Sequence, residues 1–191
     1  MSGAIFLDRD GVINRKVDGD YVREWSQFEF LPGAVEALQH LAARGRGPLI
    51  VVTNQRGIAR GLMSAAAVDE IHQRMRAALA AQGVRLAGMH VCPHEIGTCD
   101  CRKPGVKLFL DAAHLDPTLE LERSAVVGDS LADLEAGRRL GAQSFAVSPD
   151  PAALVQAARE AGIEVSGAAP SLLNLARTGL LDRQPIAATA R

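Results

Sequence analysis

Short apolar runs alternate with longer amphipathic stretches along the chain, and each apolar run ends in polar or glycine residues. Runs of this kind are typical of strands that are buried on both faces of a parallel sheet. We predict strands over residues 4–7, 49–52, 88–91, 124–127 and 143–147.

The stretches between these runs repeat apolar residues every three or four positions, which predicts helices. The expected helices cover residues 33–43, 64–82, 107–114, 131–140, 152–161 and 171–180. Pro32 suits the first helical position and Ser64 suits an N-cap. Alternating strands and helices predict one α/β domain over residues 1–181, a parallel sheet with helices on both faces. We expect residues 182–191 to form a flexible tail.

Composition narrows the class of protein. A chain of 191 residues with 48% hydrophobic residues suits a single domain with a sizeable core. The net charge of −1 and the lack of a Lys/Arg cluster argue against nucleic-acid or membrane partners. No apolar run approaches the roughly 20 residues of a membrane span, and the N-terminus lacks a signal-peptide layout. We expect a cytoplasmic monomer that acts on a small molecule.

Two of the predicted strands end directly in carboxylates. Asp8 and Asp10 follow the first strand, and residues two apart on an extended chain point the same way, so both can face one pocket. Gly11 then lets the chain turn. Asp129 follows the fourth strand in the same manner and is a natural second ligand for a hard divalent cation. For Asp133, capping of the following helix is the favoured interpretation.

The second strand ends in Thr53, Asn54, Gln55 and Arg56. Ligands of parallel sheets bind at the carboxyl ends of the strands, which makes these residues candidates for a binding site. Capping of a turn is the alternative.

Residues 15–30 form a polar segment that contains four of the seven aromatic residues, and it is typical of a flap. We expect Phe28 and Phe30 to seal the edge of the core. The roles of Tyr21 and Trp25 stay open.

The three cysteines of the chain cannot all pair, and all of them lie between Cys92 and Cys101, which argues for a metal site over a disulfide framework. Together with His94, the thiols of Cys92, Cys99 and Cys101 can converge on one tetrahedral Zn²⁺. Because all four positions would be protein ligands, we expect the zinc to be structural. The other histidines have no such setting and are assigned no function: His40, His72, His90 and His114.

Arg102 and Lys103 follow the cysteines directly, and Lys103 is one of only three lysines in the chain. An ammonium suits a phosphoryl oxygen, and a guanidinium suits a phosphate or hydroxyl groups. Two solvated cations on a loop are the alternative.

Taken in order, these motifs resemble those of the haloacid dehalogenase superfamily of phosphohydrolases: Asp-x-Asp-Gly, Thr-Asn, Arg-Lys-Pro and Gly-Asp-x-x-x-Asp. The zinc loop and the sequence Phe-Leu-Asp-Arg-Asp-Gly-Val-Ile-Asn are similar to the subgroup of heptose-bisphosphate and histidinol-phosphate phosphatases. The resemblance covers residues 4–147. Two features depart from it: the loop between His94 and Cys99 is short, and Pro104-Gly105 replaces the Pro-x-Pro-Gly that is frequent there.

The resemblance implies a Rossmann-like sheet without a large cap domain and a magnesium-dependent phosphatase. Asp8 would be the nucleophile and Asp10 the general acid and base. Mg²⁺ would be held by the carboxylates of Asp8 and Asp129 and the carbonyl of Asp10. Thr53 and Lys103 would hold phosphoryl oxygens.

The same resemblance implies a sugar-phosphate substrate, the 7-phosphate of a heptose bisphosphate, with histidinol phosphate as the alternative. The expected substrate contacts are Asp18, Gly19, Asp20, Tyr21, Asn54, Gln55, Arg56, Arg102 and Ser130. An inactive zinc-bearing binding module and a nucleic-acid end-processing phosphatase stay open as further alternatives, and the charge balance disfavours the second.

Overall fold

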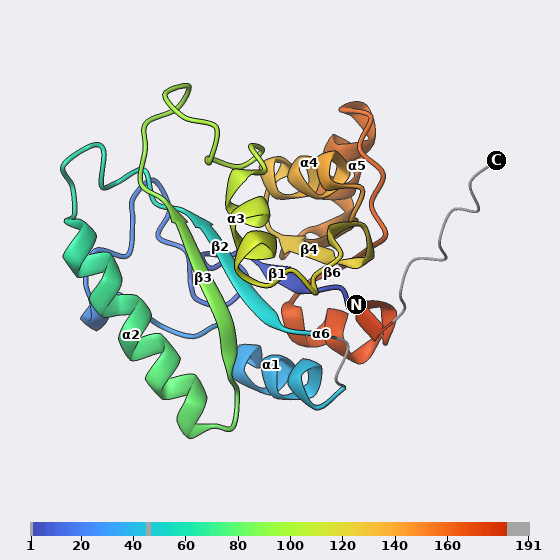
Figure 1. Cartoon of the computed structure of the whole chain (residues 1–191), viewed down its shortest axis with the longest axis horizontal. Helices are drawn as coiled ribbons and strands as arrows, with labels where there is room; N and C mark the ends of the chain where they lie inside the picture. Colours follow the sequence, from blue (N-terminus) through green and yellow to red (C-terminus); the bar gives the residue numbers. More distant parts are fainter. Residues whose placement is uncertain (1, 45–46, 183–191) are drawn as a thin grey trace.

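A computed structural model describes residues 2–44 and 47–182 of the chain. Its centre is a parallel sheet in the order β3-β2-β1-β4-β5-β6 (Figure 1). The strands are β1 (Ile5–Leu7), β2 (Leu49–Asn54), β3 (Leu86–Cys92), β4 (Ala125–Gly128), β5 (Gln143–Val147) and β6 (Gly167–Ala169). The predicted fold class, a Rossmann-like parallel sheet between helices, is confirmed.

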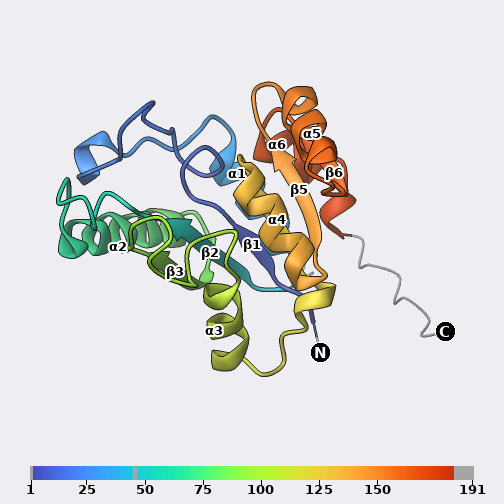
Figure 2. The same cartoon turned by 90° about the horizontal axis from the view of Figure 1, so that it is seen from above.

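Helices cover both faces of the sheet (Figure 2). They are α1 (Ala34–Ala43), α2 (Ala65–Ala81), α3 (Lys107–Leu115), α4 (Leu131–Leu140), α5 (Pro151–Glu160) and α6 (Leu172–Arg177). Short 3-10 turns are η1 (Trp25–Gln27), η2 (Leu121–Arg123) and η3 (Leu180–Asp182).

The alternation of side chains along the strands separates two cores. Ile5 and Leu7 pack with residues of α1, α2 and α6 on one face. Phe6, between them in sequence, points to the opposite face and packs with α3 and α4. Phe6 also meets the ring of Phe109 edge to face at 5.0 Å. This burial on both faces explains the continuous apolar runs of the sequence.

The predicted elements differ from the structure at a few places. Strand β6 was not predicted, because Gly-Ala-Ala lacks the β-branched and aromatic residues that indicate a strand. Helix α6 is shorter than the predicted 171–180. The N-cap of α1 is Gly33 with φ 77°, so Pro32 precedes the cap and does not occupy the first helical position. The predicted tail lies outside the described residues, except for Asp182, which ends η3.

The two ends of the flap, residues 15–30, are bonded to each other. The Arg15 amide donates to the Glu29 carbonyl at 2.8 Å. Trp25 and Phe28 stack at 4.8 Å, and both pack with Phe30 against the core, so Phe28 and Phe30 seal its edge as predicted. Among residues 2–44 and 47–182, no further domain covers the sheet, and no helix is both long and apolar enough to span a membrane.

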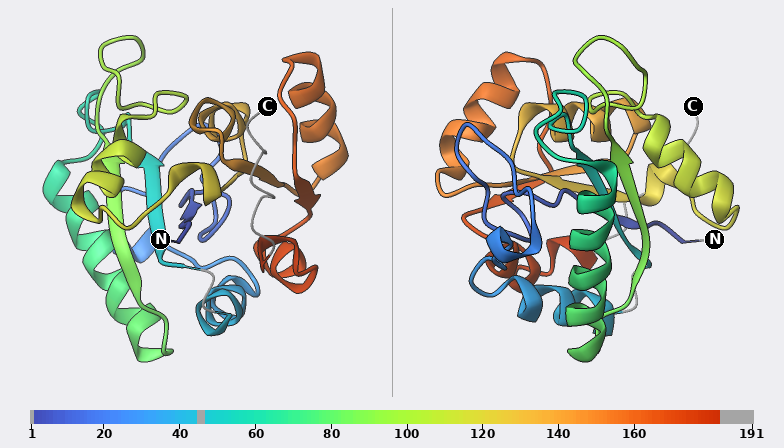
Figure 3. Two further views of the ribbon diagram at one scale, coloured as in Figure 1. Left: turned by 45° about the vertical axis from the view of Figure 1, so that its right-hand side comes forward. Right: turned by 90° about the vertical axis from the view of Figure 1, so that its left-hand side faces the viewer.

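The strand order brings polar residues from distant segments to one end of the sheet. β1 lies between β2 and β4, and the chain reverses direction of winding at this point. Ligands of such sheets bind at this place. The long loop that follows β3 projects from the sheet there (Figure 3).

Candidate active site

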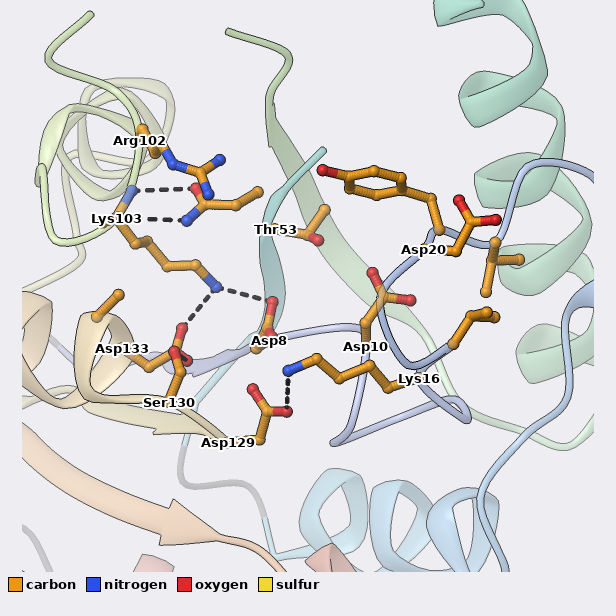
Figure 4. A pocket seen from close by; sticks show the side chains of 15 residues that line it. Asp8, Asp10, Lys16, Asp20, Thr53, Arg102, Lys103, Asp129, Ser130 and Asp133 are labelled. Carbon is orange, nitrogen blue, oxygen red and sulfur yellow. Dashed lines mark hydrogen bonds and ion pairs between the residues drawn. The ribbon is translucent and has the colours of Figure 1, made fainter. Parts of the chain in front are cut away.

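A cavity of about 350 Å³ lies at the carboxyl ends of β1, β2 and β4 (Figure 4). Its lining includes most of the residues that the sequence singled out: Asp8, Asp10, Asp20, Tyr21, Thr53, Asn54, Arg102, Lys103, Asp129 and Ser130. These residues come from five separate stretches of the chain, which the fold brings together.

Asp8 and Lys103 form an ion pair at the floor of this cavity. The Lys103 ammonium donates to Asp8 Oδ1 at 2.7 Å. Burial raises the pKa of Asp8 to about 7, and the nearby carboxylates of Asp133 and Asp10 add to this, although the charge of Lys103 opposes it.

Lys103 is buried and has two further partners. Its ammonium lies 2.6 Å from Asp133 Oδ1 and donates to the Val52 carbonyl at 2.6 Å. Burial alone would lower the pKa of Lys103, but the charges of Asp133 and Asp8 raise it, so the ammonium stays protonated.

The interpretation of Asp133 as a helix cap is therefore wrong. Asp133 is buried, pairs with Lys103 and accepts a hydrogen bond from the Ser130 hydroxyl. The N-cap of α4 is Ser130, whose side chain makes no capping bond. The sequence shows the spacing of Asp129 and Asp133. The contact between Asp133 and Lys103 could not be predicted, because the two residues are distant in sequence and only the fold brings them together.

The Asp10 carboxylate accepts hydrogen bonds from three residues, of which the sequence analysis named only Gln55 as a site candidate. The carboxylate accepts from Arg9 Nη2 at 2.9 Å, from Asn14 Nδ2 at 2.9 Å and from Gln55 Nε2 at 2.8 Å. Burial alone would raise the pKa of Asp10, but the charge of Arg9 and the hydrogen bonds from Asn14 and Gln55 outweigh it and lower the pKa. The only feature of the sequence that could have indicated a role for Arg9 is its position between Asp8 and Asp10, directly after a buried strand.

Asp129 is paired with Lys16, a residue of the flap. Lys16 Nζ lies 2.8 Å from Asp129 Oδ2. Burial raises the pKa of Asp129, and the bond to Lys16 opposes this effect. A Cβ atom on Gly11 would clash with Asp129 Oδ2, and Gly11 has φ 86°, a left-handed conformation that favours glycine at this turn.

The acids fit a hard divalent cation. One carboxylate oxygen from each of Asp8, Asp129 and Asp133 lies within 4.8 Å of the others. Oxygen ligands of this kind suit Mg²⁺. The carboxylate of Asp10 is not in this group.

The polar residues after β2 have separate environments. Thr53 is buried in the cavity wall and accepts from Gln55 Nε2 at 2.9 Å. Asn54 Oδ1 accepts from the Lys103 amide at 3.0 Å, and its Nδ2 donates to the Lys103 carbonyl at 3.3 Å. Arg56 pairs with Glu95 on the loop after β3, and neither Gln55 nor Arg56 lines the cavity.

The predicted substrate contacts of the flap divide between two cavities. Asp20 and Tyr21 line the main one. Asp18 lines a neighbouring cavity of about 420 Å³ that shares Lys16 and Asp129 with it. Gly19 lines neither of them. Arg102 Nη1, at the main cavity, is buried and has no hydrogen-bond partner among the described residues.

The loop after β3 gathers the four predicted zinc ligands. Cys101 Sγ lies 3.3 Å from Cys92 Sγ, 3.4 Å from Cys99 Sγ and 3.1 Å from His94 Nδ1. Ligands of a tetrahedral zinc site with Zn–S bonds of about 2.3 Å lie roughly 3.5–3.8 Å from one another. The cluster fits such an ion, and it ends two residues before Lys103.

Comparisons with known proteins agree with this geometry. A family model described as HAD-hydrolase-like matches residues 100–163. A D-glycero-alpha-D-manno-heptose-1,7-bisphosphate 7-phosphatase of Mycobacterium bovis is 51% identical over 144 residues, which cover 74% of this chain and 75% of that protein. A D-glycero-beta-D-manno-heptose-1,7-bisphosphate 7-phosphatase of Escherichia coli is 38% identical over 182 residues, 90% of this chain and 88% of that protein.

A solved structure has the same fold. The D,D-heptose 1,7-bisphosphate phosphatase from B. bronchiseptica, complexed with magnesium and phosphate, is 31% identical and has a TM-score of 0.81. The alignment covers 95% of this chain and 99% of that one. The resemblance inferred from the motifs is thereby confirmed. The chain belongs to the heptose-1,7-bisphosphate 7-phosphatase family of haloacid dehalogenase-like phosphatases.

Proposed function

We propose that this chain hydrolyses the 7-phosphate of D-glycero-D-manno-heptose 1,7-bisphosphate through an aspartyl-phosphate intermediate. The proposal rests on one observation: four charged residues of the predicted site line the same cavity. They are Asp8, Asp10, Lys103 and Asp129. The names of the relatives supply the substrate.

Asp8 acts as the nucleophile. Its carboxylate oxygen forms a bond to phosphorus while the bond from phosphorus to the C7 oxygen of the sugar breaks. The buried Lys103 ammonium stabilises the ionised form of Asp8 and the charge of the transferring phosphoryl group. Since the ammonium already has three acceptors, a phosphoryl oxygen must replace one of them, and the Thr53 hydroxyl offers a second contact.

Asp10 transfers protons in both half-reactions. It protonates the departing sugar oxygen and then takes a proton from the water that hydrolyses the aspartyl phosphate. The donors around Asp10 favour its carboxylate, which suits the second half-reaction. For the first half-reaction, the negative phosphate of the substrate opposes the charge of Arg9 and raises the pKa of Asp10 again.

Magnesium fits the carboxylates of Asp8 and Asp129, and when bound it would neutralise the repulsion between these acids and the phosphate. Arg102 would bind the sugar or its second phosphate, because its side chain lines the cavity and a guanidinium suits bidentate recognition of a phosphate. Zinc at the cysteines and His94 would hold the loop that carries Lys103. We expect a cytoplasmic monomer, and the net charge of −1 argues against nucleic-acid partners.

The test is steady-state turnover of the two anomers of the heptose bisphosphate beside histidinol phosphate. We expect Mg²⁺-dependent phosphate release, with at least one anomer preferred over histidinol phosphate by about 100-fold in kcat/KM, a typical effect of several specific polar contacts. Asp8→Asn should abolish the activity. A preference for histidinol phosphate, or full activity of Asp8→Asn, would disprove the proposal.

A further inference from the structure

Arg9 is the largest fully buried side chain of the described residues, with an exposed fraction of 0%. A guanidinium is rarely buried in this way unless its donors are paired. Arg9 lies between Asp8 and Asp10 in sequence, but its side chain turns away from the cavity, whose lining does not include it.

One side of the guanidinium is bonded to Asp10. Arg9 Nη2 donates to both carboxylate oxygens of Asp10 at 2.9 Å. The geometry of Asp10 therefore follows the orientation of the guanidinium plane, because such paired bonds are directional.

The other side of the guanidinium is bonded to His72, a buried residue of α2. Arg9 Nη1 lies 3.0 Å from His72 Nε2. Since a guanidinium can only donate, Nε2 must accept, and the ring proton is on Nδ1. Burial and the charge of Arg9 lower the pKa of His72 to about 3, so the ring is neutral and able to accept near pH 7.

We propose that His72 is a positioning residue for proton transfer: it orients the buried guanidinium of Arg9, which in turn holds the carboxylate of Asp10 in line with the leaving oxygen. The inference rests on the proposed function, in which Asp10 is the general acid. Without the acceptor on α2, Nη1 would be left unpaired in the interior, and the guanidinium would tilt to find another partner.

The test compares two leaving groups. A sugar or alkyl oxygen needs a proton to depart, whereas p-nitrophenolate leaves without one, and kcat/KM reports the steps up to its departure. His72→Leu should lower kcat/KM for the heptose bisphosphate about 10-fold, part of the 10²–10⁴-fold typical of a general acid. For p-nitrophenyl phosphate we expect a change of less than about twofold. His72→Gln, whose amide oxygen can accept from Arg9, should restore most of the loss.

Met75→Ala is the matched control, because Met75 is buried on the same helix and belongs to the core. It should lower the melting temperature without changing the ratio of kcat/KM for the two substrates. An equal loss for both substrates in His72→Leu, or equal behaviour of the Leu and Gln variants, would overturn the inference. If the native protein hydrolyses another alkyl phosphate in place of the heptose bisphosphate, the proposed function fails, and the same comparison on that substrate still decides the role of His72.

Discussion

At the scale of single residues, Lys16 is bonded to the Asp129 carboxylate that magnesium would bind. Lys16 Nζ lies 2.8 Å from Asp129 Oδ2, and 54% of the Lys16 side chain is exposed. An ion pair of this exposure contributes at most about 1 kcal/mol. We predict that Lys16→Met tightens Mg²⁺ binding by about threefold to fivefold, because removal of the ammonium frees Asp129 and removes a repulsive charge. Titration calorimetry with Mg²⁺ measures this without turnover.

Lys107→Met is the control for the lost charge, because Lys107 pairs with Asp111 on α3 and lies outside the main cavity. It should leave the Mg²⁺ affinity unchanged. Weaker Mg²⁺ binding by Lys16→Met would show that the ammonium supports the site.

At the scale of elements, the loop between β3 and α3 carries both the cysteine–histidine cluster and Lys103. Only Arg102 separates Cys101 from Lys103, and Asn54 of β2 holds the Lys103 backbone through both its amide and its carbonyl. We predict about one zinc per chain, and removal of it should lower both the melting temperature and kcat, by about 10-fold or more for kcat, because the position of Lys103 depends on the loop. Metal analysis, thermal melting and turnover of Cys99→Ser measure these effects.

Asn54→Ala distinguishes two contributions to the position of Lys103, the bonds from Asn54 and the metal-binding loop. It should keep the zinc and lose part of kcat, since only the bonds between the Asn54 side chain and the Lys103 backbone are removed. A zinc-free protein with full kcat would show that the loop does not position Lys103.

At the scale of the whole molecule, magnesium should stabilise the fold more strongly as pH rises. The folded pKa of Asp8 is about 7, raised from 3.8, so the folded state retains a proton on Asp8 that the unfolded state has lost. Asp8 therefore lowers stability as pH rises from about 4 to 7. Mg²⁺ would bind the ionised form of Asp8 and offset the destabilising effect of its charge. Below pH 7, binding must also displace the proton from Asp8, which weakens the apparent affinity for Mg²⁺. At one subsaturating Mg²⁺ concentration, the increase in melting temperature should be larger at pH 8 than at pH 6. An Mg²⁺ concentration of 100 times its Kd should raise the free energy of unfolding by about 2.7 kcal/mol.

Asp8→Asn is the control, because the amide does not titrate. Mg²⁺ should raise the melting temperature of this variant less than that of the native protein, and the increase should vary less between pH 6 and pH 8. An Mg²⁺ effect in the native protein that is equal at pH 6 and pH 8 would contradict a raised pKa of Asp8.

The sequence by itself determined the elements of the fold except β6, and the acids of the site except the role of Asp133. Burial of β1 on both faces appears directly as an apolar run, and Asp8 and Asp10 are placed by the local geometry of the strand that they follow. The grouping of the three cysteines and His94 on the loop could likewise be predicted, because the four residues lie within ten positions of sequence.

Only the tertiary structure decided the partners of these groups. Lys103 meets Asp8 across 95 positions of sequence, Arg9 meets His72 across 63, and Lys16 meets Asp129 across 113. Periodicity and turn preferences are local, whereas these contacts depend on strand order and on burial. The same burial shifts the pKa values of Asp8 and His72 in opposite directions, since it disfavours the charged form of each.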